Sequence, residues 1–443
     1  MNKNDICIIS LGCAKNIVDS ESMGQVLQRD GYRLVAEPKK AGVVVVNTCG
    51  FIGDARDESY TILGELAAAK RKNQLIIAAG CLTQRYREEV ASRIPGINGI
   101  LGTRRWMDIA QVVRALQRQK PGEPLYHLSE TPDSGGEVEG VLRAARQAGS
   151  AYIKIADGCR RPCAFCAIPL IKGKPVSRPT DSIIHEARIL QESGVKELVL
   201  IAQDTTDYGS DLGIADGLAK LLEQLTSEVP DMPWIRVMYA YPGYVTDRLI
   251  EVMATRPQIL HYLDIPLQHG HPDTLKRMKR PPNLGWVRNT LTKMRTAMPD
   301  LSIRSTFIVG YPGETDAEFQ ALLDFMEELK LDHAGAFPFS FEPGTASESL
   351  GDPVPLEVKK ARLEQLMLTQ EQISLGCNQA QVGRTLDVLV EGVGDGITLG
   401  RSYRDAPEID GLVITAGDAE VGQFIKVKVN GAMAHDLTGT RLD

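Results

Sequence analysis

Long apolar segments are absent from this 443-residue sequence, and its cysteines are few for its length. No apolar run approaches a membrane span, and the opening residues MNKNDICIIS lack the basic, apolar and small-residue pattern of a secretory signal. Eight cysteines are too few for a disulfide framework and indicate metal ligands or buried thiols. We therefore expect a cytoplasmic protein, long enough for two or three domains.

An excess of positive charge is absent as well. The formal net charge is −7, whereas a protein that holds bulk nucleic acid by its phosphates usually carries a basic face. The charge does not exclude a nucleic acid, but it makes a basic protein partner at least as plausible.

A run of three cysteines, C-x3-C-x2-C, stands near the middle of the chain at Cys159, Cys163 and Cys166. The segment before it, AYIKIADG, alternates like a strand and ends in an Asp-Gly turn. A tetrahedral zinc site needs a fourth ligand, and no other Cys or His lies within fifteen residues on either side. Three thiolates can instead hold three irons of a 4Fe–4S cube and leave the fourth iron open to a small molecule. A three-cysteine zinc loop and buried thiols are the alternatives.

The first part of the sequence alternates short β-branched runs with helical patterns. Strands are predicted at 6–11, 43–46 and 75–79, with helices at 20–30 and 57–70. This order predicts an α/β fold, with a doubly wound parallel sheet as the N-terminal domain.

Each of these three strands is followed by a cysteine: Cys13, Cys49 and Cys81. The carboxyl ends of neighbouring parallel strands lie at one edge of a sheet, about 4.8 Å apart. The three thiols would therefore surround one point and form a second cluster site. The alternative is three unrelated core cysteines, because cysteine is often buried. Cys7 lies inside the first strand, and we expect it in the core.

The cysteine loop after a strand resembles the signature of the radical S-adenosylmethionine (SAM) enzymes. SLGCAKNIVDSE, VVVNTCGFIGDARDES and AAGCLTQRY resemble the N-terminal domain of the methylthiotransferase family within them. The tRNA-modifying branch of that family usually has Gln-Met in place of Ala14-Lys15 and Ser in place of Gly50. This sequence is similar to the ribosomal-protein aspartate branch at both places, and its GRSYRDAPEIDG at 400–411 also resembles that branch.

Composition indicates the domain boundaries. Residues 116–150 are rich in Pro, Gly, Ser and charge, so we predict a linker there after an N-terminal domain at 1–115. Relatives usually carry a short Thr-Pro-x-His-Tyr stretch before the next strand, which residues 135–149 replace here, and we expect only local surface structure from them. A radical SAM core with a connecting helix is expected at 151–375, and a C-terminal TRAM domain at 376–443.

Six strand patterns alternate with helical patterns in the central domain, which predicts an open, partial (β/α) barrel rather than a closed eightfold one. The predicted strands are 152–156, 197–202, 235–239, 261–265, 303–309 and 334–339, and the helices are 182–193, 213–226, 246–254, 284–298 and 316–329. The active site of such a barrel lies at the carboxyl ends of its strands, where the Cys159 loop begins.

Three polar stretches also follow predicted strands: 203–206, 264–269 and 310–315. The family resemblance implies that they help to hold SAM or shape its cavity. The last, GYPGET, equally suits a tight turn that starts a helix. Loop histidines are more often structural hydrogen-bonders than bases, so we assign neither His269 nor His271 a catalytic role.

The tail begins with a predicted amphipathic helix at 355–375, followed by Cys377, which has no companion ligand and is taken as structural. Five short strands with glycine-rich turns then predict a small closed β-barrel of OB-like character, similar to the TRAM module. These strands are 386–390, 398–401, 412–415, 424–429 and 436–439. From residue 378 onward the tail carries six basic and ten acidic residues. A module that grips tRNA would be basic, whereas an acidic one suits a basic ribosomal protein, unless the acidity only aids solubility.

The resemblance implies a transferase with two 4Fe–4S clusters and SAM as cofactors. Two cysteine trios would ligate the clusters: Cys159, Cys163 and Cys166 the radical SAM cluster, and Cys13, Cys49 and Cys81 the auxiliary cluster that carries the sulfur. One electron from a flavodoxin or ferredoxin would cleave SAM to methionine and a 5′-deoxyadenosyl radical. The radical would take hydrogen from the β-carbon of an aspartate on small-subunit ribosomal protein twelve. A second SAM would methylate the sulfur, and transfer would give 3-methylthioaspartate, with no catalytic side chain beyond the cluster ligands.

Two alternatives stay open. The first is the same chemistry on tRNA, at an isopentenyl-adenosine. The second is a non-enzymatic iron–sulfur or zinc factor that docks on the ribosome through its C-terminal barrel.

Overall fold

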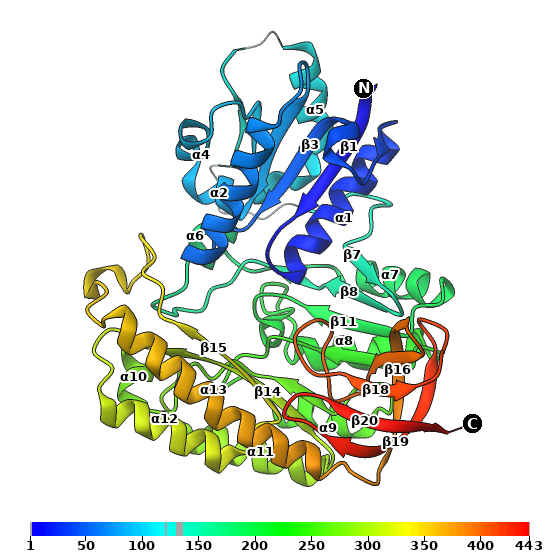
Figure 1. Cartoon of the computed structure of the whole chain (residues 1–443), viewed down its shortest axis with the longest axis vertical. Helices are drawn as coiled ribbons and strands as arrows, with labels where there is room; N and C mark the ends of the chain where they lie inside the picture. The colour runs from blue at the N-terminus through cyan, green and yellow to red at the C-terminus, as the bar shows by residue number, and fades with distance from the viewer. Residues whose placement is uncertain (1, 120–121, 130–135, 443) are drawn as a thin grey trace.

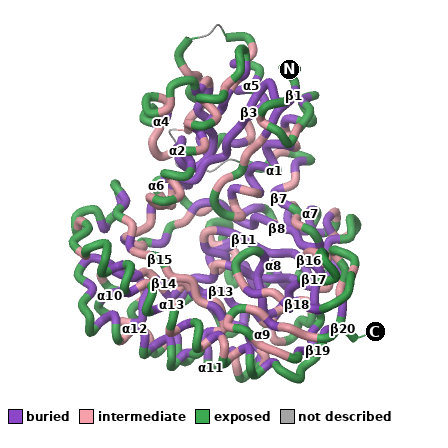
Figure 2. Tube along the Cα trace, in the orientation of Figure 1, coloured by how far each residue is buried: buried purple, intermediate pink, exposed green. Residues whose placement is uncertain are grey.

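The computed structural model describes residues 2–119, 122–129 and 136–442. An N-terminal α/β domain lies above a larger central domain, and a small β-barrel packs beside the central domain (Figure 1). Buried residues run through the strands of each part, so each part has its own core (Figure 2).

The N-terminal domain is built on a six-stranded parallel sheet in the order β2-β1-β3-β4-β5-β6. Its strands are β1 (Asn2–Ser10), β2 (Arg33–Leu34), β3 (Ala41–Thr48), β4 (Leu75–Gly80), β5 (Gly99–Gly102) and β6 (Leu125–His127). Helices cover both faces, α1 (Ala14–Arg29) and α5 (Ile109–Arg118) on one, and α2 (Gly53–Ala68), α3 (Cys81–Tyr86) and α4 (Glu88–Arg93) on the other. The predicted doubly wound domain is confirmed.

Alternate residues of β3 explain why both faces are covered. Val43 and Val45 pack toward α1 and α5, whereas Val44 and Val46 pack toward α2. A parallel strand that is apolar on both faces must be covered on both. Cys7 of β1 is 1% exposed and belongs to the second of these cores, as expected.

The segment at 116–150 contributes a strand to each of its neighbours. β6 is the last strand of the N-terminal sheet, and β7 (Ala144–Gln147) pairs antiparallel with the first central strand. Ala144 and Ala145 are buried there, so residues 135–149, as far as the structure describes them, do more than form surface structure.

The central domain is an open, partial barrel of six parallel strands, as predicted, and we call these six strands the strand wall. They are β8 (Ser150–Lys154), β11 (Glu197–Ile201), β12 (Trp234–Val237), β13 (Tyr262–Asp264), β14 (Ser302–Val309) and β15 (His333–Pro338). A bridge between Ile235 and Ile259 joins β12 to the β13 side. The outer face is covered by α7 (Thr180–Glu192), α8 (Gly217–Glu228), α9 (Asp247–Thr255), α11 (Leu284–Ala297) and α12 (Asp316–Leu329).

The chain also forms several short elements. In the central domain and after it they are β9 (Ala156–Asp157), β10 (Val176–Ser177), α6 (Ile168–Lys172), α10 (Pro272–Arg277) and 3-10 turns at Thr205–Asp207 and Glu348–Leu350; the N-terminal domain has 3-10 turns at Pro38–Lys40 and Thr103–Asp108. The antiparallel β9–β10 pair encloses the cysteine loop between its two strands.

The C-terminal part begins with the long helix α13 (Leu356–Gln379), which packs along α12 and β15 (Figure 1). A closed five-stranded barrel follows in the order β16-β17-β18-β20-β19, as predicted. Its strands are β16 (Thr385–Gly394), β17 (Ile397–Arg401), β18 (Val413–Ala416), β19 (Phe424–Ala432) and β20 (Leu437–Leu442). No helix within the described ranges is both long and apolar enough to cross a membrane.

Buried ion pairs fasten this barrel to the central domain. Arg401 at the end of β17 binds Glu197 at 2.6 Å, and Arg236 of β12 binds the other oxygen of the same carboxylate at 2.7 Å. Glu197 is fully buried between the two guanidinium groups, which, against the effect of burial, hold its pKa near 2. The loop after β17 also places the Asp410 carboxylate on Arg304 of β14. The barrel is therefore joined rigidly to the strand wall.

A buried ionic cluster joins the N-terminal domain to the central domain. We call it the Asp19 cluster, and its members are Asp19, Arg143, Lys154, Asp157 and Lys172. Lys154 Nζ lies 2.7 Å from Asp19 Oδ1, and Lys172 Nζ lies 3.0 Å from Asp19 Oδ2. Burial alone would raise the pKa of the Asp19 carboxyl, but Lys154, Lys172 and Arg143 outweigh it and hold that pKa well below its usual value.

A second contact between these domains centres on Glu342, which follows β15. Its carboxylate accepts a hydrogen bond from Arg85 of α3 at 2.6 Å and faces Arg56 of α2 at 3.4 Å. Arg104 adds hydrogen bonds to the carbonyls of Leu170 and Ile171 in α6. The two domains are thus tied at several points around the carboxyl ends of their strands.

We expect Asp19→Asn to destabilise the full chain, because it leaves three buried cations with one carboxylate. Removing one partner from a buried ion pair costs about 3 kcal/mol or more. The fall in the thermal unfolding midpoint, followed by circular dichroism, measures the effect. Glu21→Gln is the matched control, because it removes an exposed carboxylate from the same helix. Equal midpoints for the two variants would contradict a stabilising role for the cluster.

Candidate functional site

The loop after β8 carries the first cysteine trio. Gly158 turns the chain with a φ of 75°, and a Cβ atom there would lie 2.0 Å from the carbonyl oxygen of Lys174. The predicted turn is therefore present, and the close approach requires glycine. Cys159 N–H donates to Gly173 O at 3.0 Å, and Cys166 N–H donates to Cys163 O at 3.1 Å. These bonds fold the loop back over the strand ends.

The thiols of this loop influence one another. Burial, together with the neighbouring Cys163 and Cys159 thiols, raises the pKa of Cys166 to about 12. Burial likewise raises the pKa of Cys159 to about 11, with Cys163 contributing in the same direction. The three sulfurs thus lie within electrostatic reach of one another at the mouth of the strand wall.

The second trio lies at the carboxyl edge of the N-terminal sheet. Cys13 precedes α1 as its N-cap, Cys49 follows β3 directly, and Cys81 opens α3 directly after β4. A Cβ atom on Gly12, whose φ is 87°, would lie 2.8 Å from Cys49 Cβ and 3.1 Å from its sulfur. The β1 loop therefore reaches the end of β3, so that Cys13 and Cys49 share one edge of the sheet.

Asn16 ties these three strand ends together. Its side-chain amide donates to Leu11 O at 2.9 Å and to Thr48 O at 3.1 Å, which links the ends of β1 and β3. Its Oδ1 accepts from Cys81 Sγ at 3.7 Å. Burial raises the pKa of the Cys49 thiol to about 11 and that of Cys81 to about 12.

The donor set fits iron–sulfur clusters better than a single metal ion. Within the described ranges, no three Cys, His, Asp or Glu side chains are arranged to hold one ion. A cube differs because each cysteine ligates a different iron, so its ligand sulfurs stand apart. Each trio supplies three thiols without a fourth side-chain ligand, which matches a cube with one open iron. The residues present therefore fit two clusters.

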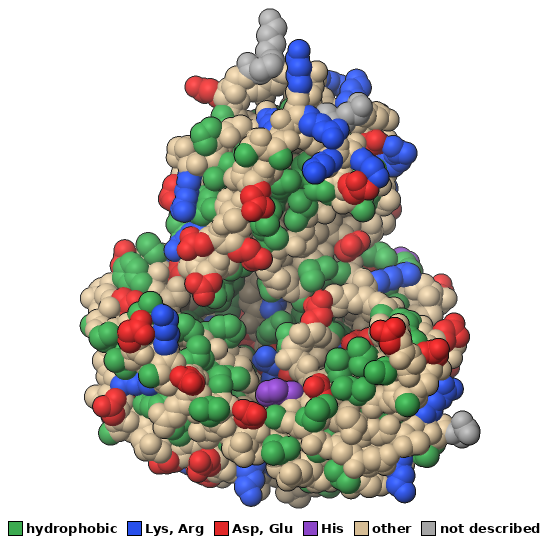
Figure 3. Space-filling model, in the orientation of Figure 1, with side chains coloured by type: hydrophobic (Ala, Val, Ile, Leu, Met, Phe, Trp, Pro, Cys, Tyr) green, Lys and Arg blue, Asp and Glu red, His purple; other side chains and the backbone are tan. Residues whose placement is uncertain are grey.

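One member of the second trio contacts the segment that follows the first trio. Cys81 packs against Ala167, the residue after Cys166 and the N-cap of α6, and against Ile171 within α6. Figure 3 shows the face of the molecule hollowed between the N-terminal domain and the parts below it. The Asp19 cluster lies at the same joint, because Lys172 of α6 binds Asp19 of α1. The joint between the domains thus sets the separation of the trios.

Lys15 reaches from α1 into this region. Its ammonium nitrogen lies 3.1 Å from the centroid of the Tyr239 ring. Burial lowers the pKa of Lys15, while Cys13 and Asp264 act in the opposite direction. Tyr239 itself has a φ of 63°, an unusual value for a bulky residue, and its N–H donates to Asp264 Oδ2 at 3.0 Å.

Two of the three polar stretches predicted near SAM present a buried oxygen that lacks a hydrogen bond from the described residues, although Asp264 Oδ1 also faces Arg304 Nη1 at 3.6 Å. Gln203 Oε1 and Asp264 Oδ1 accept no hydrogen bond from any described residue. Burial raises the pKa of the Asp264 carboxyl, although Arg304 opposes this. These atoms are available to a bound molecule, and their contact with SAM stays a prediction.

The GYPGET stretch at 310–315 has a structural role. Thr315 is the N-cap of α12 in a capping box with Glu318, and Glu314 accepts two hydrogen bonds from Gly310 N–H and one from Arg362. His269 is fully buried with its Nε2 3.3 Å from Glu314 Oε2. His271 Nδ1 accepts from Asp273 N–H at the start of α10. Both histidines make structural contacts.

Sequence reasoning missed a basic hollow beside Cys163. It has a volume of about 460 Å³, and its walls are Arg160, Arg161, Pro162, Tyr241, Tyr244, Lys279, Arg280 and Pro281. Tyr241 Oη lies 3.7 Å and Arg280 Nη1 3.6 Å from Cys163 Sγ. The Arg161 guanidinium stacks 3.5 Å from the Tyr244 ring centroid. The aromatic stretch YAYPGY after β12 was the one signal in the sequence.

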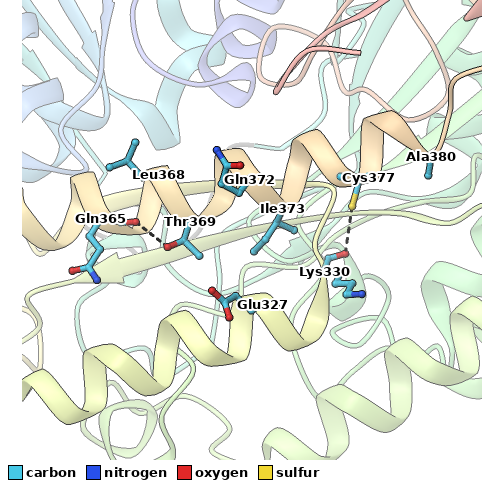
Figure 4. A pocket seen from close by; sticks show the side chains of 10 residues that line it. Glu327, Lys330, Gln365, Leu368, Thr369, Gln372, Ile373, Cys377 and Ala380 are labelled. Atoms are coloured by element: carbon cyan, nitrogen blue, oxygen red, sulfur yellow. Dashed lines mark hydrogen bonds between the residues drawn. The ribbon is translucent and has the colours of Figure 1, made fainter. Parts of the chain in front are cut away.

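A larger hollow of about 840 Å³ lies elsewhere, between α12 and α13 (Figure 4). Cys377 lies on its wall, with its sulfur facing Lys330 O, and none of the six proposed cluster ligands lines it. It is an open groove between helices without converging polar groups, so it is not the candidate site.

Family models match three parts of the chain in the order of its domains. Residues 5–102 match Uncharacterized protein family UPF0004, residues 153–326 match the Radical SAM superfamily, and residues 382–442 match the TRAM domain. Among solved structures, the radical S-adenosylmethionine methyltransferase TsrM from Kitasatospora setae, with cobalamin and a 4Fe-4S cluster bound, is similar with a TM-score of 0.56 and 14% identity. The match covers 90% of this chain and 81% of that one, and shows the fold alone.

Full-length relatives are more informative. The ribosomal protein uS12 methylthiotransferase RimO of Chloroflexus aurantiacus is 48% identical, over 98% of this chain and 99% of that protein. The proteins of the same name from Roseiflexus sp. and Thermoanaerobacter sp. are 46% and 40% identical, each over 98% of this chain and at least 97% of the relative. The protein therefore belongs to the family of ribosomal protein uS12 methylthiotransferases, RimO.

Proposed function

We propose that this protein attaches a methylthio group to the β-carbon of an aspartate on ribosomal protein uS12, giving 3-methylthioaspartate. The observation that carries the proposal is the placement of two cysteine trios, on two different domains, at one joint. Cys81 of one trio packs against the helix that begins directly after Cys166 of the other. Sulfur insertion at an unactivated carbon needs a radical source and a sulfur source close together.

The six cysteines divide between two clusters in this proposal. Cys159, Cys163 and Cys166 hold the cluster that binds SAM, and Cys13, Cys49 and Cys81 hold the auxiliary one. When bound, the first cluster supplies one-electron cleavage of SAM to an organic radical, and the auxiliary cluster supplies a sulfur atom for transfer. The chain holds the two trios at a fixed separation through the Asp19 cluster and the Glu342 contact. Cys49 and Cys81 are buried and thereby shielded from water, whereas Cys166 is half-buried.

The C-terminal barrel supports a basic protein as the substrate. Arg401 and Arg404, two of its six bases, are buried in the joint with the central domain, together with Asp405 and the carboxylate of Asp410, two of its ten acids. Acids therefore outnumber bases on the part of the barrel that faces solvent. An acidic surface steers a basic ribosomal protein toward the site and repels the phosphates of tRNA. We place the reaction in the cytoplasm, where such a partner is made.

The substrate is tested by incubating the reconstituted protein, SAM and a reductant with uS12 and, separately, with tRNA that lacks the methylthio group. We expect uS12 alone to gain one methylthio group in place of hydrogen, located on an aspartate by tandem mass spectrometry. Modification of the tRNA alone would overturn the proposal. Zinc in place of iron, with no SAM cleavage after reduction, would favour a non-enzymatic ribosome-binding factor.

The assignment of the cysteines to two clusters predicts that substitutions in the two trios abolish different steps of the reaction. Cys163→Ala should abolish cleavage of SAM, because the cluster that binds SAM loses a ligand. Cys49→Ala should still release 5′-deoxyadenosine but should no longer modify uS12. Cys377→Ala is the control and should do both, since this residue lies away from both trios. Product and deoxyadenosine are quantified in the same reaction, and sulfur transfer by Cys49→Ala would remove the auxiliary assignment.

An electron carrier of the flavodoxin or ferredoxin type completes the proposal. The basic hollow supports a docking place for it, because Tyr241 and the buried Arg280 contact Cys163 on the inside, whereas Arg160 and Lys279 are exposed. The acids that pair with Arg160 and Arg161 are Asp207 and Asp204, which are buried beneath them. The hollow therefore presents positive charge in a chain that is negative overall, which suits an acidic carrier.

Reversal of charge in the hollow tests this docking place. Lys279→Glu should weaken binding of flavodoxin about tenfold at low salt, since one favourable contact becomes repulsive. Lys220→Glu, on an exposed face of α8, is the matched control and should bind as the unaltered protein does. SAM cleavage driven by dithionite, which needs no docking, should be the same in both variants. Equal flavodoxin affinities for the two would contradict the docking place.

A further inference from the structure

The first turn of α1 enters the space above the central strand wall. Ala14, Ile17 and Val18 of this turn pack in one apolar cluster with Tyr152 and Tyr239 of the central domain. Lys15 lies in the same turn, two residues after Cys13. Its side chain therefore extends between the cysteine edge of the N-terminal sheet and the mouth of the strand wall.

Among the described residues, the ammonium group of Lys15 has no ion-pair partner. Its nitrogen lies 3.1 Å from the Tyr239 ring centroid, and no carboxylate among the described residues is close enough to form an ion pair. Two other lysines at this joint differ sharply, because Lys154 and Lys172 each contact both Asp19 and Asp157. A partly buried cation without an anion is costly, and a bound anion relieves that cost.

The backbone that carries the Tyr239 ring is held in a strained conformation. Tyr239 has a φ of 63°, and its N–H is fixed by the carboxylate of Asp264, which is 1% exposed. Such values persist where surrounding contacts enforce them, and they are frequent at functional sites. The ring of Tyr239 thus supports the Lys15 ammonium from one side and leaves its other donors available.

We infer that Lys15 binds the side-chain carboxylate of the substrate aspartate. This inference rests on the proposed function, which makes an aspartate the modified residue. The β-carbon is bonded directly to the carboxylate carbon, so a cation that holds the carboxylate also fixes the reacting carbon beside the Cys13 trio. The charge-assisted hydrogen bond also selects aspartate over asparagine, which has the same shape but carries no charge.

The test compares two peptides of the modified uS12 segment, one with the aspartate and one with asparagine in its place. Binding to the reconstituted, SAM-loaded protein is measured by fluorescence anisotropy without a reductant, so that no turnover occurs. We expect the unaltered protein to prefer the aspartate peptide by about tenfold or more, as for one charge-assisted hydrogen bond. Lys15→Met should lose that preference and bind both peptides alike, whereas Lys15→Arg should keep most of it.

Lys220→Met is the matched control and should preserve the preference, because this lysine is exposed on α8. A merely structural role for Lys15 would weaken both peptides equally and leave their ratio intact, and that result would overturn the inference. Unfolding midpoints show whether a variant is misfolded. If Lys15→Met is misfolded, the ratio of the affinities for the two peptides, measured for Lys15→Arg, decides. Absence of uS12 modification by the unaltered protein would instead refute the proposed function, which separates the two failures.

Discussion

The structure depends above all on the joint that holds two cysteine-bearing edges face to face. One cysteine trio lies at the edge of the N-terminal sheet and the other on the central domain. Asp19 of α1 joins them by binding Lys154 and Lys172 on either side of the Cys159 loop. Buried charges are a costly way to connect domains, but their geometry is directional in a way that apolar packing is not. The separation of the trios is thereby fixed to one arrangement.

The same joint explains why polar residues gather between two apolar cores. Each domain has an apolar core of its own, and a smaller apolar cluster joins Val18 of α1 to Tyr152 of the central domain and Leu389 of the barrel. Asn16 bonds the ends of β1 and β3, Arg104 bonds the carbonyls of α6, and Lys15 rests on Tyr239. The strand order of the N-terminal sheet contributes as well. β1 and β3 are neighbours from which the chain departs in opposite directions, and the carboxyl ends of such a pair form a natural ligand-binding crevice.

Much of this architecture followed from sequence because buried parallel strands are continuous apolar runs. All six central strands and the five barrel strands were found within a few residues, and the strand-end position of each trio was clear. α1 was expected from residue 20 but begins at Ala14, because its first turn lacks an amphipathic pattern. β6 and β7 were hidden in a segment rich in turn formers. The basic hollow could not be foreseen, because residues 160, 241 and 280 come from three loops that only the folded chain brings together.

The attachment of the C-terminal barrel has a consequence for how this scaffold can be retargeted. Glu197 and Arg236 belong to the central strands, yet their partner Arg401 and the carbonyl of Tyr403 belong to the barrel. A chimaera that exchanged the barrel for one from another enzyme would leave a buried carboxylate and a buried guanidinium without their partners, unless residues 401–411 of this chain were retained. The barrel therefore cannot be exchanged as a whole. A new specificity has to be introduced on barrel strands that face solvent, while residues 401–411 are kept.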